Sequence, residues 1–335
     1  MIRASRVFPV TDSSHVAEAR RETAQCAEAL RMNATMVGKA ALAATELATN
    51  LVKHGGGGSL IIASDYARPN VLILIAIDKG RGIANLGAAL RDGFSTAGSP
   101  GTGLGAIRRA ASSFDVYTHE GKGTAVLCTI GEDERLPAAA EPSRITIGGV
   151  CFPKSGETES GDAWAAVTTR DVVTIAVADG LGHGPAAATA SSAFVRIIRE
   201  SPGLQIEELL QRGHDALRPT RGAAAAIARI YPGQGRLDFA GIGNIAGTIA
   251  SDDASRKVVS LSGIVGHEMR KVQTFSYPWS ASAMFVMQSD GVSASWNPDH
   301  YPGLSQHDPV LVAAVLYRDY CRGNDDATVV VAKAS

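Results

Sequence analysis

The first 130 residues combine helical and strand periods of apolar side chains. Residues 15–32 and 37–54 carry apolar positions three or four apart, which predicts two amphipathic helices. A third helix, over 103–112, is expected to open directly out of a glycine-rich loop. Short apolar runs predict strands at 60–64, 71–77, 114–118 and 124–130. The pattern predicts an α+β sandwich with helices on one face of a sheet.

The rest of the chain shows apolar runs on both sides of two helical segments. The helices are expected at 185–199 and 206–217. Strands are predicted at 145–152, 163–169, 172–178, 223–230, 237–242, 246–250, 283–287 and 327–332. Strands, two helices and then further strands indicate two sheets flanked by helices.

A stretch rich in charge, Pro and Ala separates these two patterns. It lies at 133–144, between two apolar segments that each predict a strand. Two domains are the ordinary expectation for 335 residues. The sequence therefore predicts one domain at 1–132, a linker at 133–144 and a second domain at 145–335.

Charge and composition exclude several classes of partner. Lys and Arg number 32 and Asp and Glu number 33, so no basic surface for nucleic acid or an anionic membrane is indicated. The apolar run at 71–77 is too short to cross a bilayer, and the first residues lack a signal-peptide pattern. The four cysteines form no CxxC pair, so we expect reduced thiols in a cytoplasmic protein.

Two polar residues of the second predicted helix are candidates for chemistry. Glu46 and Asn50 are four residues apart and therefore share one face of the helix. The amide oxygen of Asn50 suits a magnesium ion, and the carboxylate of Glu46 suits a base that orients or deprotonates a hydroxyl group. The alternative is an ordinary exposed polar face.

A carboxylate follows the apolar run 71–77 directly. Asp78 is succeeded by Gly80 and Gly82, where the backbone can bend sharply and a flat ring can approach. The carboxylate is placed to accept a hydrogen bond from the amino group of adenine. The alternative interpretation is a β-turn, for which Asp and Gly are common residues.

A glycine-rich loop precedes the third predicted helix. Gly101, Gly103 and Gly105 leave backbone N–H groups unhindered where the helix begins, as a phosphate cradle requires. The preceding stretch, 93–100, is rich in Gly, Ser and Thr, which predicts a lid that closes over a triphosphate.

Taken in order, these motifs resemble the GHKL ATPase superfamily, and within it the serine/threonine kinases that act as switch proteins in bacterial sigma-factor regulation. Residues 46–50 correspond to the N box, 78–82 and 101–105 to the two glycine boxes, and 123–124 to the terminal Gly-Thr pair. The stretch 88–96 is similar to the RsbT branch, the stressosome switch kinases. Arg81 stands where that branch usually has proline, so the turn of the first glycine box departs from the family.

The resemblance implies a GHKL (Bergerat) fold that binds ATP with Mg²⁺. Glu46 would be the catalytic base and Asn50 the magnesium ligand. The other residues that the resemblance implies for cofactor binding are Asp78, Gly80, Gly82, Gly101, Gly103, Leu104, Gly105 and Thr124.

Carboxylates recur at strand ends in the second half of the chain. They are Asp162, Asp179, Asp290 and the pair Asp325 and Asp326. Strand-end carboxylates supply the oxygen ligands that Mg²⁺ and Mn²⁺ prefer, and two such ions can activate a water for in-line attack on phosphorus. Each aspartate alone also fits an exposed turn, because Asp-Gly is a turn signal.

The stretches 179–184, 289–291 and 324–328 resemble the metal-dependent type 2C protein phosphatases, which have an αββα sandwich fold. Within that family the SpoIIE/RsbX branch is closest, because 160–163 and 241–244 are similar to the RsbX phosphatases. The resemblance covers 145–335.

This second resemblance implies two Mn²⁺ or Mg²⁺ ions. Asp179 would bridge them, the Gly180 carbonyl and Asp162 would serve the second ion, and Asp290 and Asp325 would hold the first. Asp179 and Asp290 would thereby be catalytic. Asp325 is preferred to the residue after it, where the wider family often has asparagine. No arginine is evident that would bind the phosphate.

The two resemblances together predict a kinase fused to a phosphatase. Both would act on serine or threonine of a STAS-domain protein and so release or restrain a sigma factor or a downstream regulator. The alternative is a nucleotide-binding anti-sigma or docking module without kinase activity, fused to an active phosphatase. A histidine-kinase-like remnant is disfavoured, because His15 is the one histidine before the N box; His54 and His183 receive no catalytic role.

Overall fold

The computed structural model describes residues 2–65, 68, 70–90, 103–131, 145–169, 172–251 and 255–334. The chain divides into two compact units. The N-terminal unit contains Ile2–Ala138 and Gln306–Arg318, and the C-terminal unit contains Ala139–Ser305 and Asp319–Ser335. The predicted lid at 93–100 and the linker at 133–144 lie outside the described residues.

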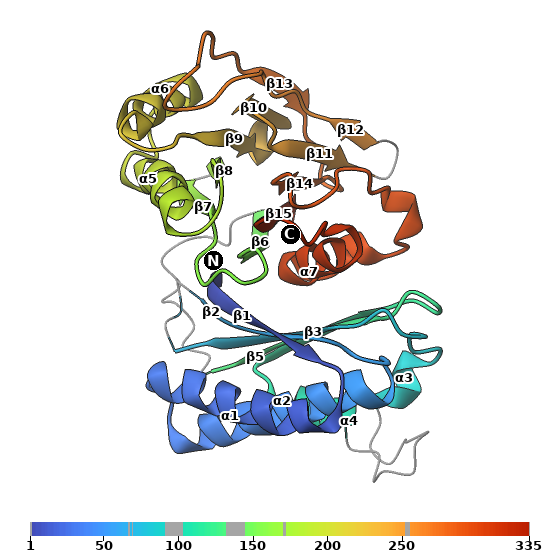
Figure 1. Ribbon diagram of the computed structural model, residues 1–335. Coiled ribbons are helices and arrows are strands. Elements are labelled where there is room, and N and C mark those ends of the chain that lie inside the picture. The colour runs from blue at the N-terminus through green and yellow to red at the C-terminus, as the bar shows by residue number, and fades with distance from the viewer. Residues whose placement is uncertain are drawn as a thin grey trace. The chain divides into compact units, whose positions relative to one another are not determined.

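The N-terminal unit is one antiparallel sheet with helices on one face (Figure 1). The strand order is β1-β2-β3-β5-β4. The strands are β1 (Ile2–Val10), β2 (Gly58–Asp65), β3 (Leu72–Ile77), β4 (Ser113–Thr118) and β5 (Thr124–Ile130). The helices are α1 (Ser13–Ala29), α2 (Ala34–Lys53), the short α3 (Leu86–Ala89) and α4 (Gly103–Ala110). The predicted α+β sandwich is confirmed.

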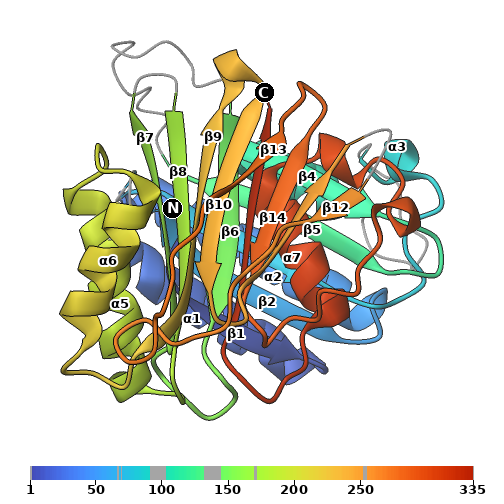
Figure 2. The same ribbon diagram turned by 90° about the horizontal axis from the view of Figure 1, so that it is seen from above.

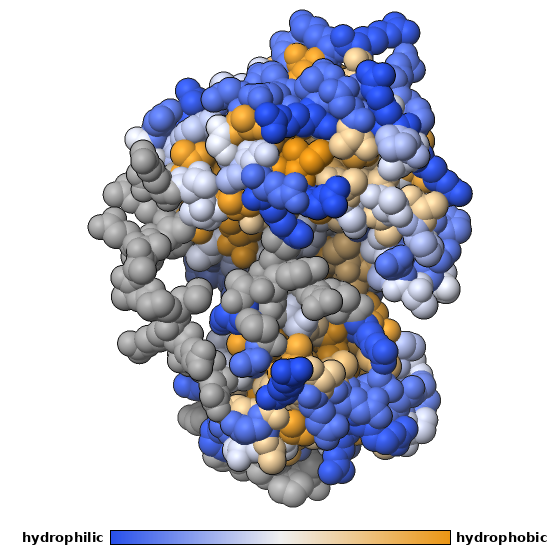
Figure 3. Space-filling model, turned by 90° about the vertical axis from the view of Figure 1, so that its left-hand side faces the viewer, coloured by the Kyte–Doolittle hydropathy of each residue, from blue (hydrophilic) through white to orange (hydrophobic). Residues whose placement is uncertain are grey.

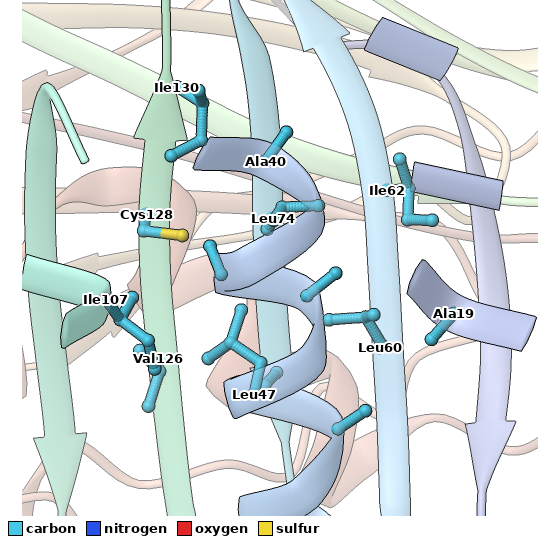
Figure 4. Close-up of a cluster of buried hydrophobic side chains, with 14 of the residues drawn as sticks. Ala19, Ala40, Leu47, Leu60, Ile62, Leu74, Ile107, Val126, Cys128 and Ile130 are labelled. Carbon is cyan, nitrogen blue, oxygen red and sulfur yellow. The ribbon is translucent and has the colours of Figure 1, made fainter. Parts of the chain in front are cut away.

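Side-chain caps and an alanine-rich face place helix α2 on this sheet. The Asn33 side chain accepts a hydrogen bond from Met36 N at 3.0 Å, so the helix begins with a capped turn. Its buried face brings Ala40 and Leu47 against Leu60, Leu74 and other side chains of the strands (Figure 4). Because alanine is small, the helix axis can approach the sheet closely. This packing fixes the distance of Glu46 and Asn50 from the sheet.

Strand β1 was not predicted, because its residues mix charged and apolar side chains without a clear run. It pairs antiparallel with β2 along its length, with an irregularity in the register between Arg3 and Arg6. A strand at a sheet edge needs only one paired side, so tertiary pairing can form it where the sequence pattern is weak.

The C-terminal unit consists of two five-stranded sheets with helices α5 (Pro185–Glu200) and α6 (Ile206–Leu217) on the outer face of one of them (Figure 2). The first sheet, in the order β13-β10-β9-β8-β7, contains β7 (Asp162–Thr169), β8 (Val172–Gly180), β9 (Ala223–Tyr231), β10 (Arg236–Ile242) and β13 (Phe275–Pro278). The second, in the order β12-β11-β14-β15-β6, contains β6 (Ile145–Phe152), β11 (Ala246–Ala250), β12 (Ser255–Lys257), β14 (Met284–Gln288) and β15 (Ala327–Ala334).

Two hydrophobic clusters hold these layers together. Between the sheets, Phe239 and Phe285 meet edge to face with ring centroids 6.3 Å apart, and both are fully buried. Under the helices, Phe194 of α5 packs with Leu209 and Leu210 of α6. The two sheets form a layered sandwich of the predicted kind, and the loops at the strand ends carry the polar residues.

Helix α7 (Pro309–Tyr320) was not predicted, because its residues are buried on every side and show no helical period of polar positions. The segment 306–318 belongs to the N-terminal unit. There His307 Nδ1 lies 2.8 Å from Asp115 Oδ1, and Asp308 N donates to Asp115 Oδ2 at 2.8 Å. Burial raises the pKa of Asp115, but these donors outweigh it and hold the pKa below its ordinary value.

The described surface is mostly polar. Figure 3 shows hydrophilic residues over most of the visible surface, with small apolar areas between them. The large hydrophobic side chains that stand exposed among the described residues are Leu42, Leu181 and Val259. None of the described helices is both long enough and apolar enough to cross a membrane.

No disulfide joins the four cysteines, and burial raises the pKa of the Cys128 thiol to about 12.

Candidate functional site

The carboxylates of the C-terminal unit meet because strand pairing brings their strand ends together. In the antiparallel pair β7 and β8, Asp162 lies directly opposite Asp179. Gly180 N donates to Gly161 O at 3.0 Å and extends this pairing by one step. Opposite residues in an antiparallel pair have Cβ atoms about 5 Å apart. Two of the predicted metal ligands are therefore neighbours.

The second sheet brings its carboxylates to the same site. Strand β14 ends at Gln288, and the next residue, Ser289, pairs with Thr328 of β15 through Ser289 N to Thr328 O at 3.1 Å. This pairing places Asp290 beside the two residues that precede β15, Asp325 and Asp326. Ser289 Oγ also donates to Asp162 Oδ2 at 2.6 Å, which joins the two sheets at the site.

Both Asp-Gly pairs need glycine for reasons of space. A Cβ atom on Gly180 would collide with the carbonyl oxygen of Ala187 in helix α5. A Cβ atom on Gly291 would collide with the carbonyl oxygen of Asp326. The backbone runs this close because both strand ends turn sharply at the carboxylates. The glycines thus permit the close approach that the cluster of acids requires.

Burial and mutual repulsion perturb the acids of this cluster. Burial, followed by the charges of Asp162, Asp290 and their neighbours, raises the pKa of Asp179 far above its ordinary value. Burial likewise raises the pKa of Asp162, although the Ser289 hydroxyl opposes this shift. For Asp290 the causes of a raised pKa are burial and then the charge of Asp325. Cations bound among these groups would relieve the repulsion.

Two buried carboxylate oxygens test whether metal ions fit here. Asp162 Oδ1 and Asp326 Oδ2 are both buried, and neither accepts a hydrogen bond from another described residue. Buried oxygens of this kind are costly unless a cation or a donor satisfies them. Among the described residues, no three acidic, His or Cys side chains stand close enough together to hold one metal ion without the help of water. Magnesium keeps several waters and needs only one or two carboxylates, so the residues fit hydrated ions.

A cavity of about 220 Å³ opens at this cluster. Three of the predicted ligands line it, Asp179, Asp290 and Asp325, whereas Asp162 and Asp326 lie deeper and are buried. Asn244 Nδ2 donates to Asp290 Oδ2 at 2.7 Å and holds that carboxylate in place.

The cavity lining includes a lysine and a histidine to which the sequence analysis gave no role. His183 was given no role, and Lys154 was not considered. His183 Nδ1 lies 2.6 Å from Glu157 Oε1. No sequence motif marks Lys154, because only the pairing of β6 with β15 brings it to the acids.

The N-terminal unit places Glu46 and Asn50 beside the start of helix α4. Both lie on α2, and a methyl group on Gly103 would stand 3.5 Å from Glu46 Oε2 and 3.5 Å from Asn50 Oδ1. The carboxylate and the amide therefore converge at the first residue of α4, where backbone N–H groups lack helical partners. This arrangement suits a phosphate with its magnesium ion.

Asp78 is fixed at the end of β3 by backbone donors. Gly80 N donates to Asp78 Oδ1 at 2.8 Å and Thr124 N donates to the same oxygen at 3.2 Å. Burial is the largest influence and raises the pKa of Asp78, although these two N–H groups oppose it.

The glycines around Asp78 hold the turn of this predicted adenine site. Gly82 has φ +73° and Gly123 has φ +81°, a backbone conformation that favours glycine. A Cβ on Gly123 would also collide with the carbonyl oxygen of Asp78.

The other residues predicted to contact the nucleotide lie at or near the start of helix α4. Leu104 packs in the hydrophobic core, so a nucleotide could meet only its backbone; Gly105 is buried behind it, and Gly101 lies outside the described residues.

Two family models match the chain in succession. Residues 8–130 match the histidine kinase-like ATPase domain, and residues 169–335 match stage II sporulation protein E (SpoIIE). The matched ranges contain Glu46, Asn50 and Asp78 in the first case, and Asp179, Asp290 and Asp325 in the second.

Relatives from Bacillus subtilis (strain 168) are similar to parts of the chain. The phosphoserine phosphatase RsbX is 26% identical over 141 residues, which are 42% of this chain and 71% of RsbX. The serine/threonine-protein kinase RsbT is 35% identical over 86 residues, which are 25% of this chain. The match spans 64% of RsbT, just under two thirds of its length.

Solved structures are similar to more than half of the chain. A structure from work on the bacterial stressosome, as a modular system adapted to control secondary messenger signaling, is 28% identical with a TM-score of 0.54; it covers 57% of this chain and 100% of its own. A structure of RsbX in complex with magnesium has a TM-score of 0.52 at 23% identity, covers 58% of this chain and 98% of its own, and supports the fold. The chain therefore joins a histidine kinase-like ATPase domain of the GHKL type to a SpoIIE-type domain of the type 2C phosphatase family.

Proposed function

We propose that this chain sets the phosphorylation level of a STAS-domain protein by carrying both opposing activities. The first domain would transfer the γ-phosphate of ATP to a serine or threonine of that protein. The second would hydrolyse the resulting phosphomonoester. The observation that carries the phosphatase half of the proposal is the cluster of strand-end carboxylates, with the buried oxygens of Asp162 and Asp326 left without donors among the described residues.

For the phosphatase activity, the protein's own residues do two things. Asp179 and Asp290 line the cavity, where a phosphoryl group would lie. Asn244 and Ser289 hold the neighbouring carboxylates Asp290 and Asp162 in position by hydrogen bonds of 2.7 and 2.6 Å. Two bound Mn²⁺ or Mg²⁺ ions would supply an activated water and neutralise phosphoryl oxygens. Asp179, Asp162, Asp290, Asp325 and the Gly180 carbonyl are the groups that we assign to hold them.

For the kinase activity, the proposal rests on the convergence of Glu46 and Asn50 at Gly103. Asn50 would bind the magnesium ion of ATP, and Glu46 would accept the proton of the attacking hydroxyl group. Asp78 would hold the adenine amino group, with Gly80, Gly82 and Thr124 shaping its surroundings. Phosphoryl transfer needs mainly positioning and charge neutralisation, which such a set of groups can provide.

The comparisons support the choice of partner that we propose. One is named a kinase and the other a phosphoserine phosphatase, and a solved relative comes from work on the stressosome. We therefore assign a STAS-domain protein as the common substrate, with a sigma factor or another regulator responding to its phosphorylation.

The proposal is tested by following labelled phosphate from ATP onto a STAS-domain protein of the same organism. The intact chain is compared with Asp290→Ala and Glu46→Ala variants. If both domains act on the same protein, label accumulates several-fold more with Asp290→Ala than with the intact chain, and it disappears with Glu46→Ala. Dephosphorylation of previously labelled partner, measured with Mn²⁺ and without ATP, should be lost in Asp290→Ala and unchanged in Glu46→Ala.

Each failure has a distinct meaning. Label transfer that survives Glu46→Ala would contradict the role of this residue as base. Absence of transfer with every variant, while Mn²⁺-dependent dephosphorylation persists, would favour a nucleotide-binding docking module fused to a phosphatase. Persistence of dephosphorylation in Asp290→Ala would contradict the assignment of the acidic cluster.

A further inference from the structure

The cavity beside the acidic cluster contains one basic side chain that the proposed function does not use. Its lining includes Asp179, Asp290, Asp325 and Lys154. Of the described residues that line it, Lys154 is the one Lys or Arg. The amino group of Lys154 has no hydrogen bond or ion pair with any described residue.

Strand register explains how Lys154 reaches the acids. Phe152, the last residue of β6, lies opposite Ala327, the first residue of β15. Because the strands are antiparallel, two residues beyond Phe152 correspond to two residues before Ala327. Lys154 and Asp325 therefore face the same end of the sheet. The backbone confirms this placement, since Lys154 N donates to Asp326 Oδ1 at 2.9 Å.

The loop that carries Lys154 is fastened at both of its ends. Glu157 N donates to Lys154 O at 2.9 Å and closes a turn over residues 154–157. The Glu157 side chain lies 2.6 Å from His183, which lies in the loop between β8 and helix α5 and also lines the cavity. Residues 154–157 thus make three contacts: Lys154 N with Asp326, Glu157 N with Lys154 O, and the Glu157 side chain with His183. The Lys154 backbone is therefore held in place before any ligand binds.

Charge explains why a lysine would stand here. A phosphomonoester is a dianion at neutral pH, and the acids of the cavity repel it unless cations intervene. A lysine on one wall supplies three N–H donors and a positive charge that a phosphoryl oxygen can meet directly. Two guanidinium groups lie near the cavity without lining it. The charge of Arg322 opposes the rise in the pKa of Asp290, and Arg221 Nη1 would stand 2.9 Å from a Cβ atom on Gly182, but neither arginine is among the lining residues.

From this arrangement we infer that Lys154 is the phosphate-binding residue of the C-terminal domain, contacting a non-bridging oxygen of a phosphomonoester held in the cavity. The inference rests on the proposed phosphatase function and supplies the basic residue that no arginine motif in the sequence provided. It concerns substrate binding, and Lys154 takes no part in holding metal ions.

The test measures binding of inorganic phosphate to the full chain in the presence of Mn²⁺ by isothermal titration calorimetry. Lys154→Met removes the charge and keeps the length of the side chain, and Lys154→Arg keeps the charge. Lys257→Met is the matched control, because Lys257 lies exposed on β12. Loss of a charge-assisted hydrogen bond should weaken phosphate binding about 10-fold to 100-fold in Lys154→Met. Lys154→Arg should recover most of it, and Lys257→Met should bind like the parent chain.

Two further measurements separate binding of phosphate from folding and from metal binding. Mn²⁺ affinity without phosphate should stay within about twofold in Lys154→Met, and the KM for p-nitrophenyl phosphate should rise more than kcat falls. The inference is overturned if Lys154→Met binds phosphate as the parent does, if its Mn²⁺ affinity falls by the same factor, or if the parent binds no phosphate. A parent that binds phosphate but hydrolyses no ester would refute the proposed function and leave the phosphate site standing.

Discussion

Replacing Asp179 by asparagine should stabilise the metal-free protein, although the residue is assigned to the centre of the phosphatase site. Asp179 lies opposite Asp162, and no described residue donates a hydrogen bond to its side chain to offset the burial and the neighbouring charges that raise its pKa. Asparagine has nearly the same shape and no charge. The substitution therefore removes repulsion without removing a contact on which the fold depends.

The size of the effect follows from the pairing geometry. Two unit charges about 5 Å apart repel by about 3 kcal/mol at an effective dielectric constant of about 20. Part of this repulsion is relieved in the parent chain, because neighbouring carboxylates can take up a proton. We therefore expect Asp179→Asn to raise the free energy of unfolding of the C-terminal unit by about 1–2 kcal/mol in EDTA at pH 7.5.

The sign of the pH dependence follows from the direction of the pKa shift. The pKa of Asp179 in the folded protein lies above its ordinary value of 3.8. At any pH between 3.8 and the folded-state pKa, the folded protein therefore binds more protons than the unfolded chain. The parent therefore loses stability as the pH rises through this window, and the advantage of Asp179→Asn should grow from pH 5 to pH 8.

The assay is urea unfolding followed by tryptophan fluorescence. All three tryptophans, Trp164, Trp279 and Trp296, lie buried in the C-terminal unit, so the signal reports on that unit. In saturating Mn²⁺ the order should reverse, because ligand at 100 times its Kd adds about 2.7 kcal/mol to the parent. The control is Asp299→Asn, an exposed residue whose change should stay within about 0.5 kcal/mol. A variant that is less stable than the parent in EDTA at pH 7.5 would refute the electrostatic reasoning.

Three other outcomes are expected. ATP affinity, measured by calorimetry, should fall as the pH is lowered toward the raised pKa of Asp78, because the protonated acid accepts a hydrogen bond from adenine more weakly than the carboxylate does; Asp78→Asn, which also lacks the charge, should bind weakly at every pH. Gly123→Ala should weaken ATP binding at least 10-fold, since its φ of +81° and the nearby Asp78 carbonyl exclude a methyl group, and unchanged binding would contradict this. Leu47→Ala, at a side chain with 1% exposure, should destabilise the N-terminal unit by about 2–5 kcal/mol in thermal unfolding followed by circular dichroism.

Much of the fold follows from local patterns, and the exceptions have physical causes. The strand before Asp179 could be predicted because an apolar run ended by a polar turn is typical of a buried strand. Helix α7 could not, because its burial on every side removes the alternation that marks a surface helix. Strand β1 could not, because its pairing with β2 compensates for a weak pattern.

The site divides in the same way. Asp179 and Asp290 could be identified from the sequence, since each lies at the end of an apolar run and precedes a glycine. In the structure both glycines are needed, because a Cβ atom at either position would collide with a neighbouring backbone. The other side chains that line the cavity beside them could not be predicted from one sequence. His183 lies in the same glycine-rich stretch as Asp179, but its contact with Glu157 comes from another loop. Lys154 reaches the cavity only through the pairing of β6 with β15. Such residues carry no local signal, because the register that brings them together is a property of the whole sheet.

Joining the two proposed activities in one chain has a consequence that separate enzymes lack. The rates of phosphorylation and dephosphorylation are both proportional to the concentration of the same polypeptide. Their ratio is therefore independent of that concentration. At saturating ATP and Mn²⁺ the final phosphorylated fraction of the partner should therefore be the same over a 30-fold range of chain concentration, while the time needed to reach it shortens in proportion. A mixture of Asp290→Ala and Glu46→Ala chains supplies the control, because changing the proportion of the two variants should shift the final fraction. A final fraction that rises or falls with the concentration of the intact chain would mean that the two domains do not act on the partner as independent, equally abundant enzymes.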